Sequence, residues 1–179
     1  EVDSRAIDFT CVDYQKYRDS TCKWYLFNKG GGYRKWFGNN AYVLNWGDGG
    51  RELREFIKSD PKRQVGGRIV NEEYFFRSGI TWFEFATSEP SFRSQDSGYV
   101  HGNKGPVVFT ERSDILSFLN SAVARYLLNI LNPTLGFNAG SISNLPVSDL
   151  ENHGSSLLVD RARTDWNAYE RSWDFQSLP

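Results

Sequence analysis

The sequence of 179 residues is poor in the residues that build disulfide frameworks and metal sites, with two cysteines, two histidines and no methionine. Cys11 and Cys22 allow one disulfide at most, and we expect two reduced thiols, because small secreted domains usually carry more cysteines. His101 and His153 stand apart, without the spacing of a zinc site. No apolar run is long enough to cross a bilayer, and we expect neither a signal peptide nor membrane contact.

Neither sign of charge dominates the composition, since 21 Lys and Arg stand against 22 Asp and Glu. Hydrophobic residues make up 39% and charged residues 24%, which is typical of a folded domain rather than a disordered chain. The length fits one domain. Because the first residue is not methionine, we expect a piece of a larger protein whose catalytic chemistry lies elsewhere.

The known catalytic and cofactor motifs are also missing. Lys29 precedes a run of glycines, but no Gly-Lys-Ser/Thr follows, so the run is not a nucleotide-binding P-loop. Asn132-Pro133 lacks the second proline and the aromatic residue of the Asn-Pro-Pro-Tyr motif of amino-methyltransferases. No Ser/His/Asp or Cys/His set is recognisable. We therefore predict no catalytic, cofactor-binding or metal-binding residue in this chain.

The most informative feature that is present is the stretch 23–40, which holds four cations, six aromatic residues and four glycines but no acidic residue. Glycines let a phosphate approach the backbone, and their N–H groups can form an anion-binding nest. These close-approach glycines are Gly30, Gly31 and Gly32. The cations suited to phosphates are Lys29, Arg34 and Lys35. A hairpin loop with inward aromatics and solvated cations explains the same composition equally well.

Two further polar segments suit DNA recognition. The first supplies Lys62 for a phosphate. Gln and Arg side chains pair bidentately with adenine and guanine edges. On that basis the candidates for base reading are Gln64, Arg68, Arg93, Gln95 and Asn103. For any single residue, an ordinary solvated loop is the stronger alternative.

Periodicity and turn residues predict a mixture of helices and strands. Strands are indicated near residues 7–14, 23–27, 41–46, 80–87, 92, 99 and 107–109. Helices are indicated over 51–58 and 113–131, with a helical turn over 71–76 and a final helix that begins at Thr164. Asp60-Pro61 ends the first helix, and 62–68 is expected to be a loop.

Several phrases of the sequence, taken in order, together resemble the region that follows the catalytic domain in PglX-like and related type II-like adenine-specific DNA methyltransferases. They are KWYLFNKGG and YRKWFGN within 23–39, VLNW at 43–46, GITW at 79–82, FLNS through ILNPT at 118–134, ISNLPV at 142–147, DW at 165–166 and SWDF at 172–175. The ISNLPV phrase also resembles type I specificity subunits. The likeness runs from about residue 23 to 175.

The resemblance implies an α/β chain of the α+β type, with an irregular, curved mixed or antiparallel sheet, one long helix and a short C-terminal helix. It implies a lead-in segment at 1–22, a DNA target recognition domain at 23–150 and a helical extension at 151–179. The implied partners are double-stranded DNA, an upstream methyltransferase domain of the same chain and other defence-system proteins.

The family's cofactor is S-adenosylmethionine, and its binding motif is absent here. We therefore expect the parent protein, a bacterial or archaeal cytoplasmic enzyme of restriction-modification or phage defence, to bind the cofactor through another domain. Two hypotheses about this chain remain open. It reads DNA sequence for the methyltransferase, or it is a scaffold that docks the catalytic domain or a partner protein.

Overall fold

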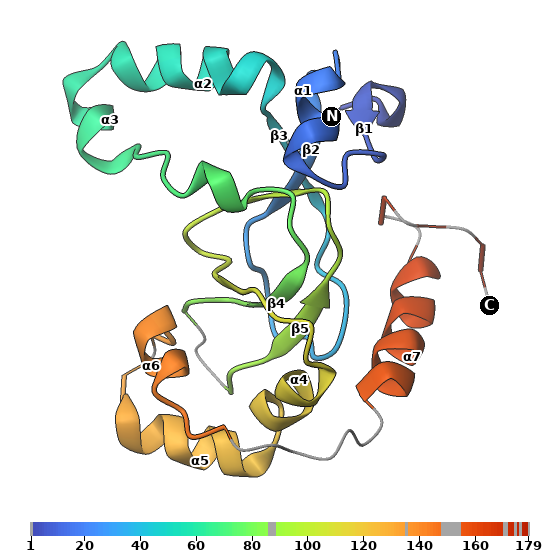
Figure 1. Ribbon diagram of the computed structural model, residues 1–179, viewed down its shortest axis with the longest axis vertical. Helices are drawn as coiled ribbons and strands as arrows, with labels where there is room; N and C mark the ends of the chain where they lie inside the picture. The colour runs from blue at the N-terminus through green and yellow to red at the C-terminus, as the bar shows by residue number, and fades with distance from the viewer. Residues whose placement is uncertain are drawn as a thin grey trace.

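The computed structural model describes residues 2–85, 89–134, 136–147, 155–169, 172–173, 175 and 177–178. Two open sheets occupy the centre, and helices surround them (Figure 1). The α+β class predicted from the sequence is confirmed. The predicted domain limit between 150 and 151 lies outside the described residues.

The first sheet is built around β2 (Trp24–Asn28). On one edge β2 pairs antiparallel with β3 (Tyr42–Asn45), and on the other it pairs in parallel with β1 (Ile7–Asp8) and then with β6 (Tyr99–His101). The second sheet has the order β5 (Phe92–Gln95), β4 (Gly79–Trp82), β7 (Val107–Val108), and all its pairs are antiparallel.

A buried asparagine joins the two sheets. Asn28, at the end of β2, donates from Nδ2 to Thr81 Oγ1 of β4 at 2.8 Å and to the Gly105 carbonyl at 2.9 Å. Its Oδ1 accepts the Gly30 N–H at 3.1 Å. All polar atoms of this amide are therefore engaged, as a buried side chain requires. The glycine-rich segment after β2 thus starts from a fixed point between the sheets.

Helices cover the sheets on several sides. The helical elements are η1 (Ser4–Ala6), α1 (Tyr14–Asp19), α2 (Gly47–Lys58), α3 (Pro61–Gly66), η2 (Glu72–Tyr74), α4 (Ser113–Leu119), α5 (Ala122–Leu131), α6 (Ala139–Ser143) and α7 (Ser155–Asn167). In Figure 1, α4, α5 and α6 lie below the second sheet, α7 lies to one side, and α2 and α3 extend away from the body.

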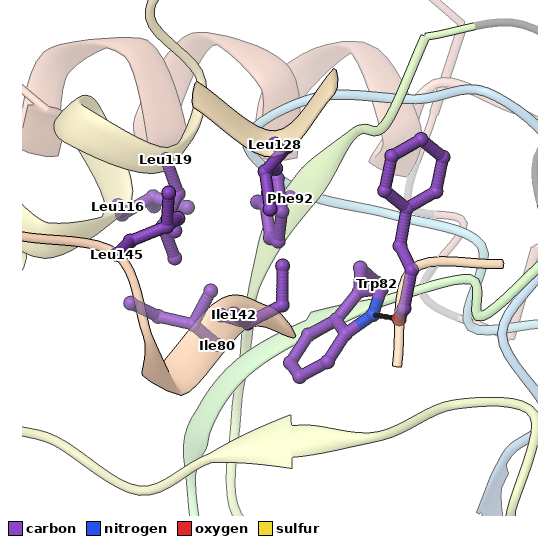
Figure 2. Packing of buried hydrophobic residues seen from close by; sticks show 9 residues of the cluster. Ile80, Trp82, Phe92, Leu116, Leu119, Leu128, Ile142 and Leu145 are labelled. Atoms are coloured by element: carbon purple, nitrogen blue, oxygen red, sulfur yellow. Dashed lines mark hydrogen bonds between the residues drawn. The ribbon is translucent and has the colours of Figure 1, made fainter. Parts of the chain in front are cut away.

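The main apolar cluster lies between the second sheet and α4–α6. Figure 2 shows its buried members Ile80, Trp82, Phe92, Leu116, Leu119, Leu128, Ile142 and Leu145. The indole of Trp82 is 1% exposed, and its Nε1 donates to the Phe137 carbonyl at 2.6 Å. This cluster holds the second sheet and its helices together as one unit.

A second, mostly aromatic cluster lies beneath the first sheet. Tyr17 of α1 stacks on Phe76 with ring centroids 5.0 Å apart, and Tyr25 of β2 meets the Tyr17 ring edge-on at 5.2 Å. Tyr17 Oη also donates to the Trp46 carbonyl at 3.0 Å. The cluster therefore fixes the point from which α2 leaves the body.

The single helix predicted over 113–131 is two helices. Asn120 interrupts it, because its side chain binds the backbone of Phe92 on β5, accepting the N–H at 3.1 Å and donating to the carbonyl at 2.9 Å. Ser121 then caps α5 by accepting the Ala124 N–H at 3.1 Å. The apolar period continues through both helices, so it does not reveal this break.

Three other predicted elements differ from the structure. Residues 61–66 form helix α3 instead of a loop, and residues 7–14 contribute only a two-residue strand followed by α1. The final helix begins at Ser155, and the Thr164 hydroxyl donates to the Asp160 carbonyl within it instead of capping its start. Strands β2 and β3, the 71–76 turn and the short strands at 92, 99 and 107–108 occur as predicted, while the strand expected over 80–87 is β4, which ends at Trp82.

Candidate nucleic-acid interface

Residues 47–70 form a projecting helical hairpin, hereafter the arm, made of α2, α3 and the segment that leads back to the body (Figure 1). Asp60 forms the bend, since its Oδ1 accepts the Lys62 N–H at 2.9 Å while Pro61 takes the first position of α3. At the base, Leu53 and Ile69 pack against the aromatic cluster. The arm is thus anchored at one end only.

The arm carries exposed cations without acidic partners. Lys58, Lys62 and Arg68 are exposed, and none of them forms an ion pair with any residue in the described part of the chain. Gln64 is also exposed, with its Nε2 3.1 Å from the Lys58 carbonyl. Arg63 lies 3.8 Å from Asp60. The arm therefore presents three unpaired cations, Lys58 and Lys62 near the bend and Arg68 on the segment that leads back to the body.

Apolar side chains accompany these cations. Phe56 is 57% exposed and carries the Arg63 guanidinium 4.0 Å above its ring. Val65 and Val70 are 82% and 58% exposed. Exposed apolar side chains on the same projecting element as unpaired cations are compatible with a contact surface. The arm is therefore the clearest candidate interface.

The predicted phosphate ligands of the glycine-rich segment have other partners. The Arg34 guanidinium forms an ion pair with Asp165 of α7, donates to the Phe37 carbonyl at 2.9 Å and stacks over Trp166 at 5.0 Å. Lys35 Nζ donates to the Asn120 carbonyl at 3.1 Å. Both side chains therefore tie this segment to helices. Lys29 stays exposed, with Nζ 4.8 Å from the Tyr42 ring centroid.

Two predicted base-reading residues lie inside the protein. Arg93 and Gln95 on β5 are 1% and 3% exposed. Arg93 lies beneath the glycine-rich segment, and Gln95 Nε2 is 3.3 Å from His101 Nδ1. Neither can contact a base edge from this position. Asn103, in the turn after β6, is exposed as the prediction requires.

The predicted residues thus form two separate groups. Lys62 and Gln64 lie on α3 of the arm, and Arg68 follows on the segment that leads back to the body. The others lie on the body, where one Nη of Arg93 is 3.4 Å from the Gly30 carbonyl of the glycine-rich segment. Lys58 was missed by the sequence reasoning, although its position just before Asp60-Pro61 places it at the bend.

The buried imidazole of His101 predicts a pH-dependent stability. Its ring contacts those of Phe75 and Phe109, with centroids 6.1 and 5.7 Å away. Burial lowers the pKa of His101 from 6.5 to about 4. As the pH falls, the unfolded chain therefore binds this proton before the folded chain does. The stability that the neutral His101 imidazole contributes is complete above about pH 6.5, and it is lost as the pH falls from about 6.5 to about 4.

We expect His101 to lower the free energy of unfolding by about 2 kcal/mol between about pH 7 and pH 5. Urea unfolding at a series of pH values measures this loss. The His101→Gln variant, which keeps a polar group beside Gln95, should show a smaller loss over the same range. An equal loss in variant and wild type would contradict the assignment to His101.

The remaining site types receive no support from the described part of the chain. There, no group of three or more His, Cys, Asp or Glu side chains could hold a metal ion. Within the same residues, no helix has the length and apolar character needed to span a membrane. Cys11 and Cys22 are free thiols, the first buried and the second half-buried.

Comparison with known proteins gives two relatives and no matching family model. The chain is 34% identical to the adenine-specific methyltransferase PglX of Lacticaseibacillus casei (strain Zhang), over 98% of its own length and 15% of that protein. It is also 34% identical to the adenine-specific methyltransferase BrxX of Escherichia coli O9:H4 (strain HS), over 86% of its length and 13% of that protein. The chain therefore corresponds to a small segment of such proteins.

Proposed function

We propose that this chain is a segment of an adenine-specific DNA methyltransferase of restriction-modification or phage defence, and that it binds duplex DNA and reads its sequence. The observation that carries the proposal is the 34% identity, over 98% of the chain, to a protein named as an adenine-specific methyltransferase. The arm supports it, because its cations match the charge of a nucleic-acid backbone.

The dimensions of the arm suit the major groove of DNA. An α-helix with its side chains is about 10–12 Å across, close to the groove width of about 12 Å. With α3 in the groove, Lys58 and Lys62 would contact phosphates, while Gln64 and Arg68 would reach base edges. Asn103 and Lys29, exposed on the body, would add a base contact and a phosphate contact.

Methyl transfer itself is assigned to another part of the protein. The chain spans about 13–15% of its curated relatives, so most of such a protein lies outside it. We propose that the methyl donor S-adenosylmethionine and the flipped adenine are bound by a separate catalytic domain in the cytoplasm. This segment would then hold the duplex in register for that domain.

Selection from a random duplex library tests sequence reading directly. Duplexes retained by the chain are sequenced after several rounds of enrichment. We expect a recurring motif of a few base pairs, because bidentate contacts discriminate bases by about 1–3 kcal/mol each. A retained pool without any enriched motif would contradict the reading function while leaving non-specific DNA binding intact.

Docking to another protein is the second candidate function. It is favoured by an exposed apolar face on α5, where Val123, Tyr126 and Ile130 are 61%, 67% and 61% exposed. Their i, i+3, i+7 spacing places them along one side of the helix. Such a face would attach the segment to the catalytic domain or to a defence partner, and its binding would respond little to salt.

A further inference from the structure

Arg93 is a buried cation without a counter-charge. It is 1% exposed, and in the described part of the chain no carboxylate lies against it. Its Nε has no hydrogen-bond partner, and both Nη atoms make only long contacts of 3.4 Å. Burial and the nearby Arg34 charge lower the pKa of Arg93 to about 10. An isolated buried charge is costly, so its retention needs a reason.

The guanidinium of Arg93 lies directly beneath the glycine-rich loop, residues 30–35. One Nη faces the Gly30 carbonyl and the other faces the Arg34 carbonyl. All described peptide bonds are trans, and a trans peptide directs its N–H opposite to its C=O. The N–H groups of Gly31 and Lys35 therefore point away from Arg93, toward the outer face of the loop.

The outer face of this loop has free donors and open space. The N–H groups of Gly31, Gly32, Tyr33 and Lys35 donate to none of the residues that the structure describes. A Cβ placed on Gly32 would meet nothing within 4 Å, so a ligand can approach there. Asn39 Nδ2 donates to the Gly32 carbonyl at 2.8 Å and holds the loop in this shape.

We propose that the outer face of loop 30–35 binds a phosphate group, with the outward N–H groups as donors and the buried Arg93 as the fixed positive charge behind them. The outward N–H groups of Gly31 and Lys35, with the unpartnered N–H groups of Gly32 and Tyr33 between them, are donors of the kind that form backbone anion sites. Arg93 then needs no protein counter-ion, because the ligand supplies the negative charge. This inference rests on the proposed function in one respect, that the phosphate belongs to the DNA backbone.

Two single substitutions test the loop site without changing the arm. Gly32→Asp places a carboxylate at the mouth of the loop, where open space and an ordinary backbone conformation tolerate a side chain. The matched control is Asn144→Asp, which adds the same charge at the exposed end of α6. Two probes distinguish the source of the phosphate: inorganic phosphate alone and a duplex of random sequence.

We expect inorganic phosphate to raise the Tm of the wild-type chain and of Asn144→Asp equally, and to leave Gly32→Asp unchanged. Sodium chloride of equal ionic strength corrects for screening. For the duplex, Gly32→Asp should lose roughly tenfold in affinity at about 0.1 M salt, the contribution of one phosphate contact. An equal phosphate response in all three chains, or none in the wild type, would overturn the site.

Arg93→Met provides an independent variant. Replacing a lone buried charge by an apolar side chain of similar length should leave the Tm without phosphate unchanged or higher, and should abolish the phosphate response. A phosphate response that persists in Arg93→Met would also overturn the inference. If this variant does not fold, the Gly32 and Asn144 pair still decides the matter.

The inference and the proposed function fail in different ways. A chain that responds to inorganic phosphate through Gly32 but does not bind any duplex has the site without the DNA function. A chain that binds duplex DNA equally well with and without Gly32→Asp, and ignores inorganic phosphate, has the function without the site.

Discussion

Neutralising the three unpaired cations of the arm should lower the affinity for duplex DNA by roughly two to three orders of magnitude at about 0.1 M salt. The variant is Lys58→Ala/Lys62→Ala/Arg68→Ala. Each phosphate contact contributes about 0.9 to the slope of log K against log salt, so the lost phosphate contacts of Lys58 and Lys62 reduce its magnitude by about 1.8, while Arg68 is lost as a base contact. Fluorescence anisotropy of a labelled duplex, titrated at several salt concentrations, measures both quantities.

A matched control changes the net charge equally at other places. Arg5→Ala/Arg125→Ala/Arg161→Ala removes three exposed arginines from η1, α5 and α7. Two of them already pair with carboxylates, Arg5 with Asp3 and Arg125 with Glu89. We expect this variant to bind nearly as tightly as the wild type. Equal losses in the two triple variants would show that overall charge, and not the arm, governs binding.

Trp82→Ala should destabilise the fold by about 3–5 kcal/mol. The indole is 1% exposed in the main apolar cluster, and it meets the Phe92 ring at a centroid distance of 5.7 Å. Its removal leaves a cavity and an unpaired Phe137 carbonyl, which accepts from Nε1 at 2.6 Å. Urea unfolding followed by far-UV circular dichroism gives the free energy of unfolding.

Tyr126→Ala is the control for this loss, because its ring is 67% exposed on α5. We expect a change within about 0.5 kcal/mol. Trp82 belongs to the GITW phrase that resembles methyltransferases. A large loss in the free energy of unfolding would therefore show that this phrase stabilises the fold. A small effect of Trp82→Ala would instead point to a contact role for the phrase.

Local signals explain what the sequence could predict of the fold. Strands β2 and β3 and the helix over 51–58 follow from alternation and helical spacing within single segments. The break at Asn120 could not be predicted, because the backbone that its side chain binds belongs to Phe92, 28 positions away. Helix α3 was missed because Asp60-Pro61 was interpreted only as the end of α2, although the same pair caps the next helix.

The same difference between local signals and long-range packing applies to the residues of the candidate site. Lys62, Gln64 and Arg68 are exposed, because a polar segment on a projecting hairpin has few neighbours to bury it. Arg93 and Gln95 look equally polar in the sequence, yet β5 carries them into the interior. Arg34 forms an ion pair with Asp165, which lies 131 positions away in the sequence. Composition identifies cations, but long-range packing decides which of them remain available to a ligand.

The salt dependence of duplex binding tests the central claim most directly, because it separates a DNA reader from a docking scaffold. Lys29, Lys58, Lys62 and the loop site offer about four phosphate contacts, which predicts a slope of log K against log salt between about −3 and −4. Anisotropy titrations of the wild-type chain between about 50 and 200 mM salt measure this slope. A slope near zero, or no binding at the lowest salt concentration, would contradict DNA binding by this chain.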